Sequence, residues 1–276
     1  MNKQDQIEKA RAFKAMHQNN LLLLPNAWTG GSAKVFEKAD FPAVGTTSAG
    51  IAYSLGYPDG EKITFDDITR VTKEILRVIS IPLTVDVERG YSDIIHEVKN
   101  NVREIIAAGA VGINLEDGIP EKGAVDDIEF FCSKIEAVAK LKEETGIPFV
   151  INARTDIFLL QIADQETMFE MTVERAKALQ AAGADCIFVP GPLNEEMIIR
   201  LRNAIDMPLN FFLHSAFFNT ARMAEIGINR LSSGSAPVRS VFNTLTKLAE
   251  EYKTGNNQKL LSHKFNYAEA NNYFGK

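Results

Sequence analysis

Cysteine, histidine and tryptophan are scarce in this chain of 276 residues, which contains two, four and one of them respectively. The two cysteines, Cys132 and Cys186, both stand among apolar residues, in the stretches EFFCSKI and ADCIFVP. So few cysteines exclude a disulfide framework, and the pattern fits buried thiols in a reducing compartment better.

Long hydrophobic runs and an excess of positive charge are missing as well. No apolar run reaches the roughly 20 residues of a membrane span, and the polar stretch MNKQDQIEKARAFKAMHQNN has no apolar core of a secretory signal. The 30 basic and 36 acidic residues give a formal net charge of -6, which provides no basic field for nucleic acid or an anionic membrane. These absences predict a cytoplasmic protein whose partner is a small molecule, with no nucleic acid and no membrane bound.

Short apolar segments rich in β-forming residues recur along the chain, with amphipathic helical stretches between them. Residues 64–79, 93–109 and 166–183 are examples of such stretches, because their apolar residues are spaced by three and four positions. This alternation is typical of a parallel sheet whose strands are joined by crossover helices. Eight segments are expected to be strands: 21–27, 41–48, 81–87, 111–117, 147–154, 185–191, 207–213 and 228–234.

The number of these units decides between two α/β architectures. A doubly wound sheet is expected to carry a G-x-G-x-x-G turn after its first strand, and none follows residues 21–27. Eight units therefore predict a (β/α)8 TIM barrel as a single domain over residues 1–276, with extra N-terminal and C-terminal helices. Residues 253–276 form a C-terminal extension, whose apolar side chains are expected to pack on the barrel or on a neighbouring subunit: Leu260, Leu261, Phe265, Tyr267, Tyr273 and Phe274.

The predicted strands end in polar residues, at the end of a barrel where active sites are built. Because side chains two positions apart on a strand share a face, Asp86 and Glu88 are expected to point the same way. Asp59 lies in the loop after the second strand. The other strand-end candidates are Thr46, Thr47, Ser48, Asn114, Glu116, Asp117, Asn152, Arg154, Asp156, Asn210 and His214.

Several carboxylates at one mouth repel one another and require a counter-charge. Ligands that are all oxygen favour Mg²⁺, with Mn²⁺ as the other candidate, over zinc. Arg154 could hold a carboxylate or a phosphonate by two hydrogen bonds, which indicates an anionic substrate. The small residues of TTSAG, 46–50, offer backbone N–H groups that suit a carboxylate or an oxyanion.

Structural interpretations of the same residues stay open. A single acid at a strand end can cap a helix or form a salt bridge on the rim. Arg154 can pair with Glu116 or Glu88 instead of a substrate, or do both in turn. Asp117 and Asp156 can support or cap the site rather than take part in it. The sequence alone also allows these acids to be structural and the site to lie elsewhere.

Four motifs in this order resemble the isocitrate lyase and phosphoenolpyruvate mutase superfamily, over roughly residues 20 to 240: TTSAGIAYSLGYPDG, VDVERGYS, INLEDG and VINARTD. The resemblance implies a Mg²⁺-dependent enzyme that binds a small 2-oxo acid or its enolate. Such an enzyme makes or breaks the adjacent C–C or P–C bond. Members assemble as tetramers with swapped C-terminal helices, which implies a homo-oligomer, a dimer or a tetramer, for this chain.

The resemblance also assigns roles to individual residues. The carboxylates that would hold the metal, directly or through water, are Asp86, Glu88 and Asp59, and Glu116 supports them. The residues that would bind the substrate are Thr47, Ser48, Ala49, Arg154 and Asn210. The candidate catalytic residues are Arg154, Glu116 and His214, and the further candidates for protonating the enolate are Glu121 and Lys122.

This sequence departs from the family pattern at the lid after the fourth strand. Lyases carry a cysteine there in a K-K-C-G-H type motif, whereas EDGIPEKGAVDDIEFF contains neither cysteine nor histidine, and lacks the asparagine and serine of the mutase lid. Gly191 stands where the lyases have a glutamate, and Glu88 is one methylene longer than the family's aspartate. Without the thiol acid, cleavage of isocitrate or methylisocitrate is not expected.

These departures favour a decarboxylase-like or small lyase activity, which proceeds through a pyruvate-like enolate and needs no dedicated acid until the enolate collapses. One alternative is the activity of a phosphonopyruvate hydrolase or a phosphoenolpyruvate mutase. A second alternative, of a different class, is a barrel that binds a metabolite without turning it over.

Overall fold

Pro25 divides the first strand into two halves, one of which pairs with the last strand of the sheet and the other with the next strand along the chain. The computed structural model describes residues 2–213, 219–255, 258, 262 and 265–275. Its parallel sheet has the order β1-β11-β10-β9-β8-β5-β4-β3-β2. The two edge strands β1 (Leu22–Leu24) and β2 (Asn26–Ala27) are the two halves of one segment on either side of Pro25, which has no N–H to donate. The sheet is therefore a closed barrel of eight strand positions.

All eight predicted strand positions are confirmed, and each observed strand is shorter than its predicted segment. The remaining strands of the barrel are β3 (Val44–Thr46), β4 (Leu83–Asp86), β5 (Gly112–Glu116), β8 (Val150–Arg154), β9 (Cys186–Phe188), β10 (Leu209–Phe212) and β11 (Arg230–Ser232). A small antiparallel hairpin of β6 (Gly118–Ile119) and β7 (Ala124–Val125), with the short 3-10 helix η1 (Pro120–Lys122) at its tip, follows β5. The predicted (β/α)8 barrel is thus correct.

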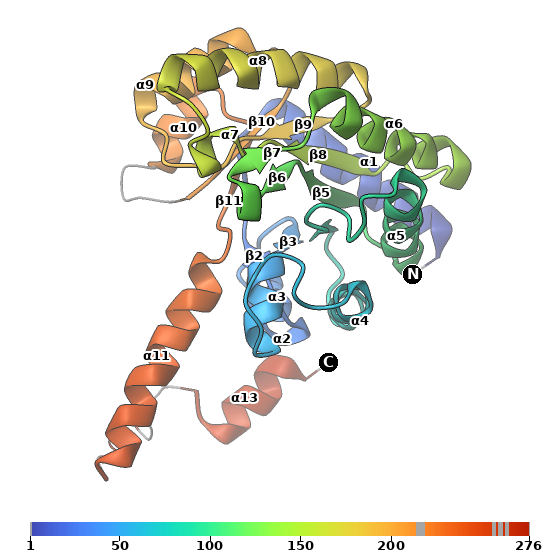
Figure 1. Cartoon of the computed structure of the whole chain (residues 1–276). Helices are drawn as coiled ribbons and strands as arrows, with labels where there is room; N and C mark the ends of the chain where they lie inside the picture. The colour runs from blue at the N-terminus through green and yellow to red at the C-terminus, as the bar shows by residue number, and fades with distance from the viewer. Residues whose placement is uncertain (1, 214–218, 256–257, 259–261, 263–264, 276) are drawn as a thin grey trace.

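Helices surround the barrel (Figure 1). In chain order they are α1 (Lys3–Asn19), α2 (Gly30–Lys38), α3 (Ser48–Ser54), α4 (Phe65–Leu76), α5 (Ile95–Ala108), α6 (Ile128–Thr145), α7 (Ile157–Leu160), α8 (Gln165–Ala181), α9 (Glu195–Ala204), α10 (Thr220–Ile226), α11 (Ala236–Lys253) and α13 (Tyr267–Phe274). Local sequence explains their limits. Thr64 and Asp67 form a capping box at the start of α4, and Gly146 ends α6 in the left-handed conformation.

Strand register places polar side chains next to one another at the carboxyl end of the barrel. Asp86 pairs in register with Asn114, which pairs with Asn152. Two residues further along these strands, Glu116 lies opposite Arg154. Because residues paired across neighbouring strands point to the same face, the barrel brings these groups to one mouth.

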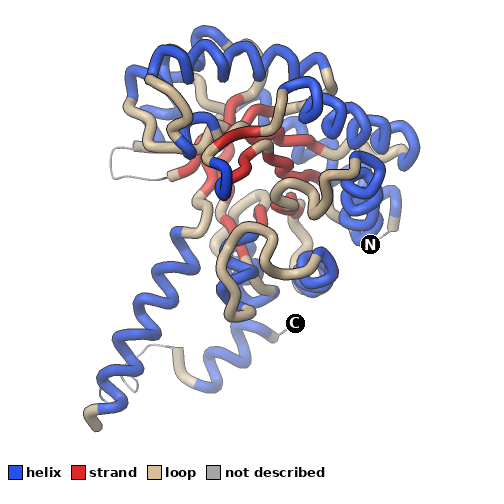
Figure 2. The backbone as a smooth tube through the Cα atoms, in the orientation of Figure 1, coloured by secondary structure: helices blue, strands red, loops and turns tan. Residues whose placement is uncertain are grey.

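The C-terminal helices extend away from the barrel. Helix α11 projects outward, and α13 lies back beside the barrel near α2 (Figures 1 and 2). The ammonium of Lys38 lies 4.5 Å from the ring centroid of Tyr273 in α13. On α11 the exposed large apolar side chains are Val241, Phe242, Leu245 and Tyr252.

Leu260 and Leu261 lie outside the described residues, and packing of residues 253–276 on a neighbouring subunit stays a prediction. Within the part of the chain that the structure describes, no helix is both long and apolar enough to cross a membrane. The cytoplasmic location likewise stays a prediction.

Candidate active site

A cavity of about 160 Å³ opens at the carboxyl ends of the strands. Seven of the residues proposed from the sequence line it: Thr47, Ser48, Ala49, Asp59, Asp86, Asn114 and Arg154. The structure does not bring all candidates to this surface. Glu88, Glu116 and Asn210 are buried behind or below the lining, and His214 lies outside the described residues.

Asp86 is the central acid of this cavity. The backbone N–H and the hydroxyl of Ser48 both donate to its Oδ2, at 3.2 and 3.0 Å. Its own N–H donates to the Thr46 hydroxyl at 2.8 Å. The second oxygen, Oδ1, is buried and has no hydrogen-bond partner. Because buried carboxylate oxygens are nearly always paired, this oxygen marks a place for a ligand, a cation or water.

Glu88 lies beside Asp86 but is held differently. Strand β4 ends at Asp86, and Glu88 has a left-handed backbone with φ of 48°. Its carboxylate accepts hydrogen bonds from the Tyr91 hydroxyl and the Glu61 N–H, each at 2.8 Å. Burial and the negative charge of Asp86 raise the pKa of Glu88 to about 7. A strained backbone at a strand end, holding a buried acid, is typical of functional sites.

Further acids add to the negative charge at this mouth. Burial and the nearby Asp86 raise the pKa of Asp59, which lines the cavity. Burial also raises the pKa of Glu116 well above its usual value, although the attraction of Arg154 opposes this. Crowded carboxylates of this kind favour either bound protons or a bound cation.

Arg154 is a cation that pairs with acids at this mouth. Its Nε and Nη2 donate to the two oxygens of Asp156 at 2.6 and 2.9 Å, and its Nη1 lies 2.7 Å from Oε2 of Glu116. The nearby carboxylates of Asp156 and Glu116 raise the pKa of Arg154 well above its usual value, despite its burial. The ion pair considered from the sequence is therefore present, and Arg154 also lines the cavity. Asp156 positions its guanidinium.

The donor set can be compared with what a divalent cation requires. Within the described ranges, no three histidine, cysteine, aspartate or glutamate side chains form a ready-made metal cluster. Mg²⁺ does not need such a cluster, because it keeps several waters and often binds through one or two carboxylates. The unpartnered Oδ1 of Asp86, with other carboxylates nearby and no sulfur or imidazole among the lining residues that the structure describes, fits hydrated Mg²⁺.

Some predicted residues have other positions, and some lining residues were missed. Asn210 is fully buried inside the barrel, where Ser232 lies 3.4 Å from its side-chain oxygen, so it does not line the cavity. The apolar lining residues could not be identified from the sequence, because their pattern is the same as that of buried core residues. The run after the last strand, SSGS, was a usable signal. The missed lining residues include Phe188, Pro190, Phe212, Leu213, Ser233, Gly234, Ser235 and Arg239.

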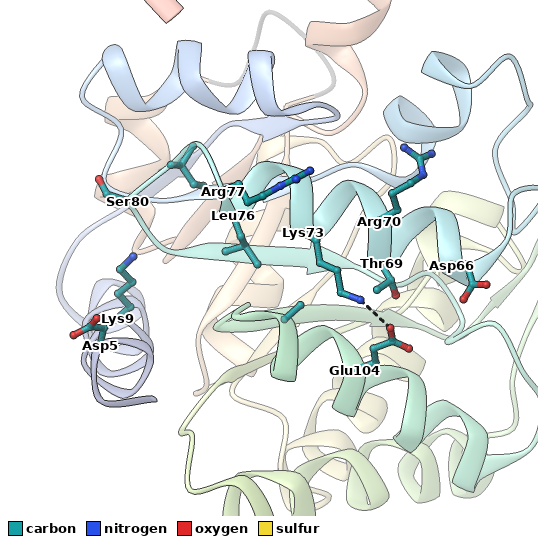
Figure 3. Close-up of a pocket in the computed structure, with 12 residues that line it drawn as sticks. Asp5, Lys9, Asp66, Thr69, Arg70, Lys73, Leu76, Arg77, Ser80 and Glu104 are labelled. Carbon is teal, nitrogen blue, oxygen red and sulfur yellow. Dashed lines mark hydrogen bonds and ion pairs between the residues drawn. The ribbon is translucent and has the colours of Figure 1, made fainter. Parts of the chain in front are cut away.

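A larger hollow of about 980 Å³ lies on the outside, between α1, α4 and α5 (Figure 3). Arg77, Ile79 and Ser80 line it and precede strand β4, so it opens at the amino ends of the strands, opposite to the usual active-site face. Its ion pair between Lys73 and Glu104 is half-exposed and adds little stability. The smaller cavity therefore remains the candidate active site.

The fold and the cavity together define a class: a TIM barrel with acids and an arginine at the carboxyl ends of its strands. The model of the phosphoenolpyruvate phosphomutase family matches residues 13–253. The chain belongs to this family, within the phosphoenolpyruvate mutase and isocitrate lyase superfamily. The superfamily resemblance inferred from the motifs is confirmed.

Three relatives illustrate this membership. An uncharacterised protein of Mycobacterium tuberculosis is 34% identical over 225 residues, which cover 80% of each chain. The 2-methylisocitrate lyase of Escherichia coli K12 is 30% identical over 209 residues, covering 72% of this chain and 68% of the enzyme. A Burkholderia cenocepacia J2315 protein, provisionally described as a lyase/mutase, has a structure with a TM-score of 0.90 at 27% identity, covering 99% of this chain and 98% of that one. The relatives with named activities include a 2-methylisocitrate lyase, a 2,3-dimethylmalate lyase and an oxaloacetate decarboxylase.

Proposed function

We propose that this protein is a Mg²⁺-dependent lyase that cleaves the C–C bond, or a P–C bond, of a small 2-oxo acid or related carboxylate through a pyruvate-like enolate. The observation that carries the proposal is the buried, unpartnered Oδ1 of Asp86 in a cavity that Arg154 also lines. A carboxylate from Asp86 and a guanidinium from Arg154 in the same cavity suit a ligand that can chelate a metal and that is also anionic. A decarboxylase-like or small lyase reaction is the favoured form.

The residues of this chain have separate tasks in such a reaction. Ser48 holds Asp86 through its N–H and hydroxyl, so that Oδ1 stays oriented. Asp86 would hold the metal, supported by Asp59 and Glu88. Bound Mg²⁺ would supply positive charge to the developing enolate oxygen. Arg154, fixed by Asp156, would hold the anionic end of the substrate.

Glu116 is a candidate source of a proton that lies buried behind the cavity lining. Burial raises its pKa, the nearby Arg154 at 2.7 Å opposes this, and a substrate anion that engages Arg154 would weaken that opposition. Glu121 instead pairs with Lys62 at 3.4 Å, and both of these side chains are more than half exposed. The role of His214 stays a prediction, because it lies outside the described residues.

The loop after β5 favours decarboxylation over the chemistry of the cysteine lyases. The β6–η1–β7 hairpin stands where those enzymes carry the lid thiol. Cys132 lies in α6 and Cys186 in β9, and neither lines the cavity. Gly118 brings this hairpin close to Asp156, since a Cβ there would lie 2.3 Å from a carboxylate oxygen of Asp156.

Calorimetry with oxalate, a mimic of the enolate, tests the site. Oxalate should bind in the presence of Mg²⁺ and far more weakly in its absence, and Asp86→Asn should remove the effect of the metal. Turnover of oxaloacetate and of phosphonopyruvate then separates C–C from P–C cleavage. Mg²⁺-dependent binding without turnover of any 2-oxo acid would support the metabolite-binding alternative. Oxalate binding that does not depend on Mg²⁺, or no oxalate binding, would mean that the active site lies elsewhere.

The apolar face of α11 supports a homo-oligomer as part of this proposal. Val241, Phe242, Leu245 and Tyr252 are between 37% and 66% exposed, which is costly for a helix that stays in water. Light scattering on the purified protein should give a mass that is a multiple of 30.5 kDa, a dimer or a tetramer. A monomer at micromolar concentration would contradict this.

A further inference from the structure

Five residues of the lining of the candidate cavity form an apolar wall. Phe188 ends strand β9 and Pro190 follows it, Phe212 ends β10 and Leu213 follows it, and Leu159 lies in α7. The rings of Phe188 and Phe212 meet edge to face, with centroids 6.4 Å apart and planes at 86°. This wall is therefore a packed surface that contributes to the shape of the cavity, and no acid or amide side chain interrupts it among these five residues.

Arg154 connects the apolar wall to the polar half of the cavity. Its guanidinium lies 5.6 Å from the ring centroid of Phe188, within the range of a cation–π contact. A substrate whose anionic end is held at Arg154 consequently has its remaining part next to Phe188. A carboxylate that lay against these aromatic rings would be a buried charge without a partner, so a hydrocarbon group suits this place better.

We propose that the substrate is a 2-oxo acid that carries a short hydrocarbon substituent, and that Phe188, Phe212 and Leu213 form the subsite for this substituent. This inference rests on the proposed function and specifies its substrate class. The size of the cavity agrees, because about 160 Å³ is well below the roughly 300 Å³ at which pockets for drug-sized ligands begin. Only a short chain fits beside the 2-oxo acid group.

The other reading of this cavity gives the substrate a second anionic group. Arg239 lines the rim from α11 and is exposed, with no ion pair among the described residues. A dicarboxylate could reach it across the mouth. The two readings predict opposite orders of affinity, and a ligand series can distinguish them.

The experiment measures inhibition or binding of the full-length protein with Mg²⁺ by oxalate, pyruvate, 2-oxobutyrate, 2-oxovalerate and 2-oxoglutarate. We expect the affinity to rise by about fourfold for each added CH2 group from pyruvate to 2-oxovalerate, as for apolar surface removed from water. 2-Oxoglutarate should bind at least tenfold more weakly than 2-oxovalerate. Phe188→Ala and Phe212→Ser should each flatten the rise while oxalate still binds.

Two variants keep the test independent of folding. Phe188→Leu retains a hydrocarbon surface and should retain most of the rise. Phe169→Ala removes an aromatic ring from the outer helix α8, where Phe169 contacts Arg200 at 4.3 Å, and should leave the whole series unchanged.

Three outcomes are decisive. A flat series together with Mg²⁺-dependent oxalate binding would overturn the hydrocarbon subsite and leave the proposed function intact. Tighter binding of 2-oxoglutarate that Arg239→Gln abolishes would assign specificity to Arg239 and overturn it as well. Absence of oxalate binding would remove the proposed function itself.

Discussion

Two groups of mostly buried charges lie at the carboxyl end of the barrel, and they differ in how completely they are neutralised. The open cluster consists of Asp59, Asp86, Glu88, Glu116, Asp156 and Arg154. The closed network consists of Asp117, Asp126, Arg89, Lys134 and Arg175. Glu116 and Asp117 are consecutive in the chain, yet they belong to different groups: Glu116 ends β5 and pairs with Arg154, whereas Asp117 follows the strand and pairs with Arg175.

The closed network satisfies its carboxylates. Asp117 accepts from Nε of Arg175 at 3.0 Å on one oxygen and from the N–H of Asp156 at 2.9 Å on the other. Asp126 lies 2.7 Å from Arg89 and 3.3 Å from Lys134, one through each of its oxygens. Three cations thus face two acids, and their carboxylate oxygens are all paired.

The open cluster has the opposite balance. Five acids face the guanidinium of Arg154, and the charge of the buried Arg230 also acts on Asp86, so the acids still outnumber the cations. Oδ1 of Asp86 has no hydrogen-bond partner. Buried groups that lack compensation cost stability, so such an imbalance is retained where a ligand or a metal supplies the missing charge. The comparison teaches that incomplete pairing, rather than burial of charge as such, distinguishes the site from the scaffold. The predictions below test this distinction.

Asp86→Asn should give the largest effect. Losing the central acid of the open cluster should lower kcat/KM for a 2-oxo acid substrate by roughly 10⁴-fold, about 5 kcal/mol of transition-state stabilisation, because the proposed metal would lose its principal ligand. The thermal midpoint should stay unchanged or rise, since repulsion within the cluster falls. Steady-state kinetics with Mg²⁺ and thermal denaturation of the same samples measure both quantities.

The matched control for Asp86 is Asp126→Asn in the closed network. It should lower the thermal midpoint, because it leaves Arg89 and Lys134 without their shared acid, and it should leave kcat/KM of the folded protein nearly unchanged. If Asp126→Asn abolished turnover in folded protein, the distinction between the two groups would not hold.

Arg175→Met should destabilise the fold by roughly 4 kcal/mol, because it leaves the fully buried Asp117 without its cation. Chemical denaturation by urea measures the loss. Arg154→Met in the open cluster is its counterpart and should instead remove most of the activity. Equal effects of the two variants on stability, with equal residual activity, would contradict the comparison.

The fold and most residues of the open cluster could be predicted from the sequence. The backbone at Glu88 and the apolar wall of the cavity could not. Apolar β-rich runs gave all eight strand positions, and polar residues at the strand ends pointed to Asp86 and Arg154. Alternation along a strand does not explain the position of Glu88, because strand β4 ends at Asp86 and Glu88 has a positive φ, although the charge of Asp86 acts on it. The apolar wall could not be predicted, since Phe188 and Phe212 have the pattern of core residues until closure of the barrel places them at a cavity.

Glu88 provides a smaller and pH-dependent test of the open cluster. Its pKa of about 7 in the folded protein exceeds its ordinary value of 4.5, so the folded state retains a proton that the unfolded chain has released between these values. The stabilisation is complete below pH 4.5 and is lost as the pH rises through 7. In a metal chelator, the free energy of unfolding should therefore fall by roughly 3 kcal/mol over this window.

Urea denaturation at several pH values between 4.5 and 7.5 measures this slope. Glu88→Gln should flatten it, because the amide cannot titrate, while Glu170→Gln on the exposed face of α8 should leave it unchanged. An equally steep fall in Glu88→Gln would assign the proton to another acid of the open cluster. A flat profile in the unmodified chain would mean that the charges of this cluster are already balanced without a cation, as they are in the closed network.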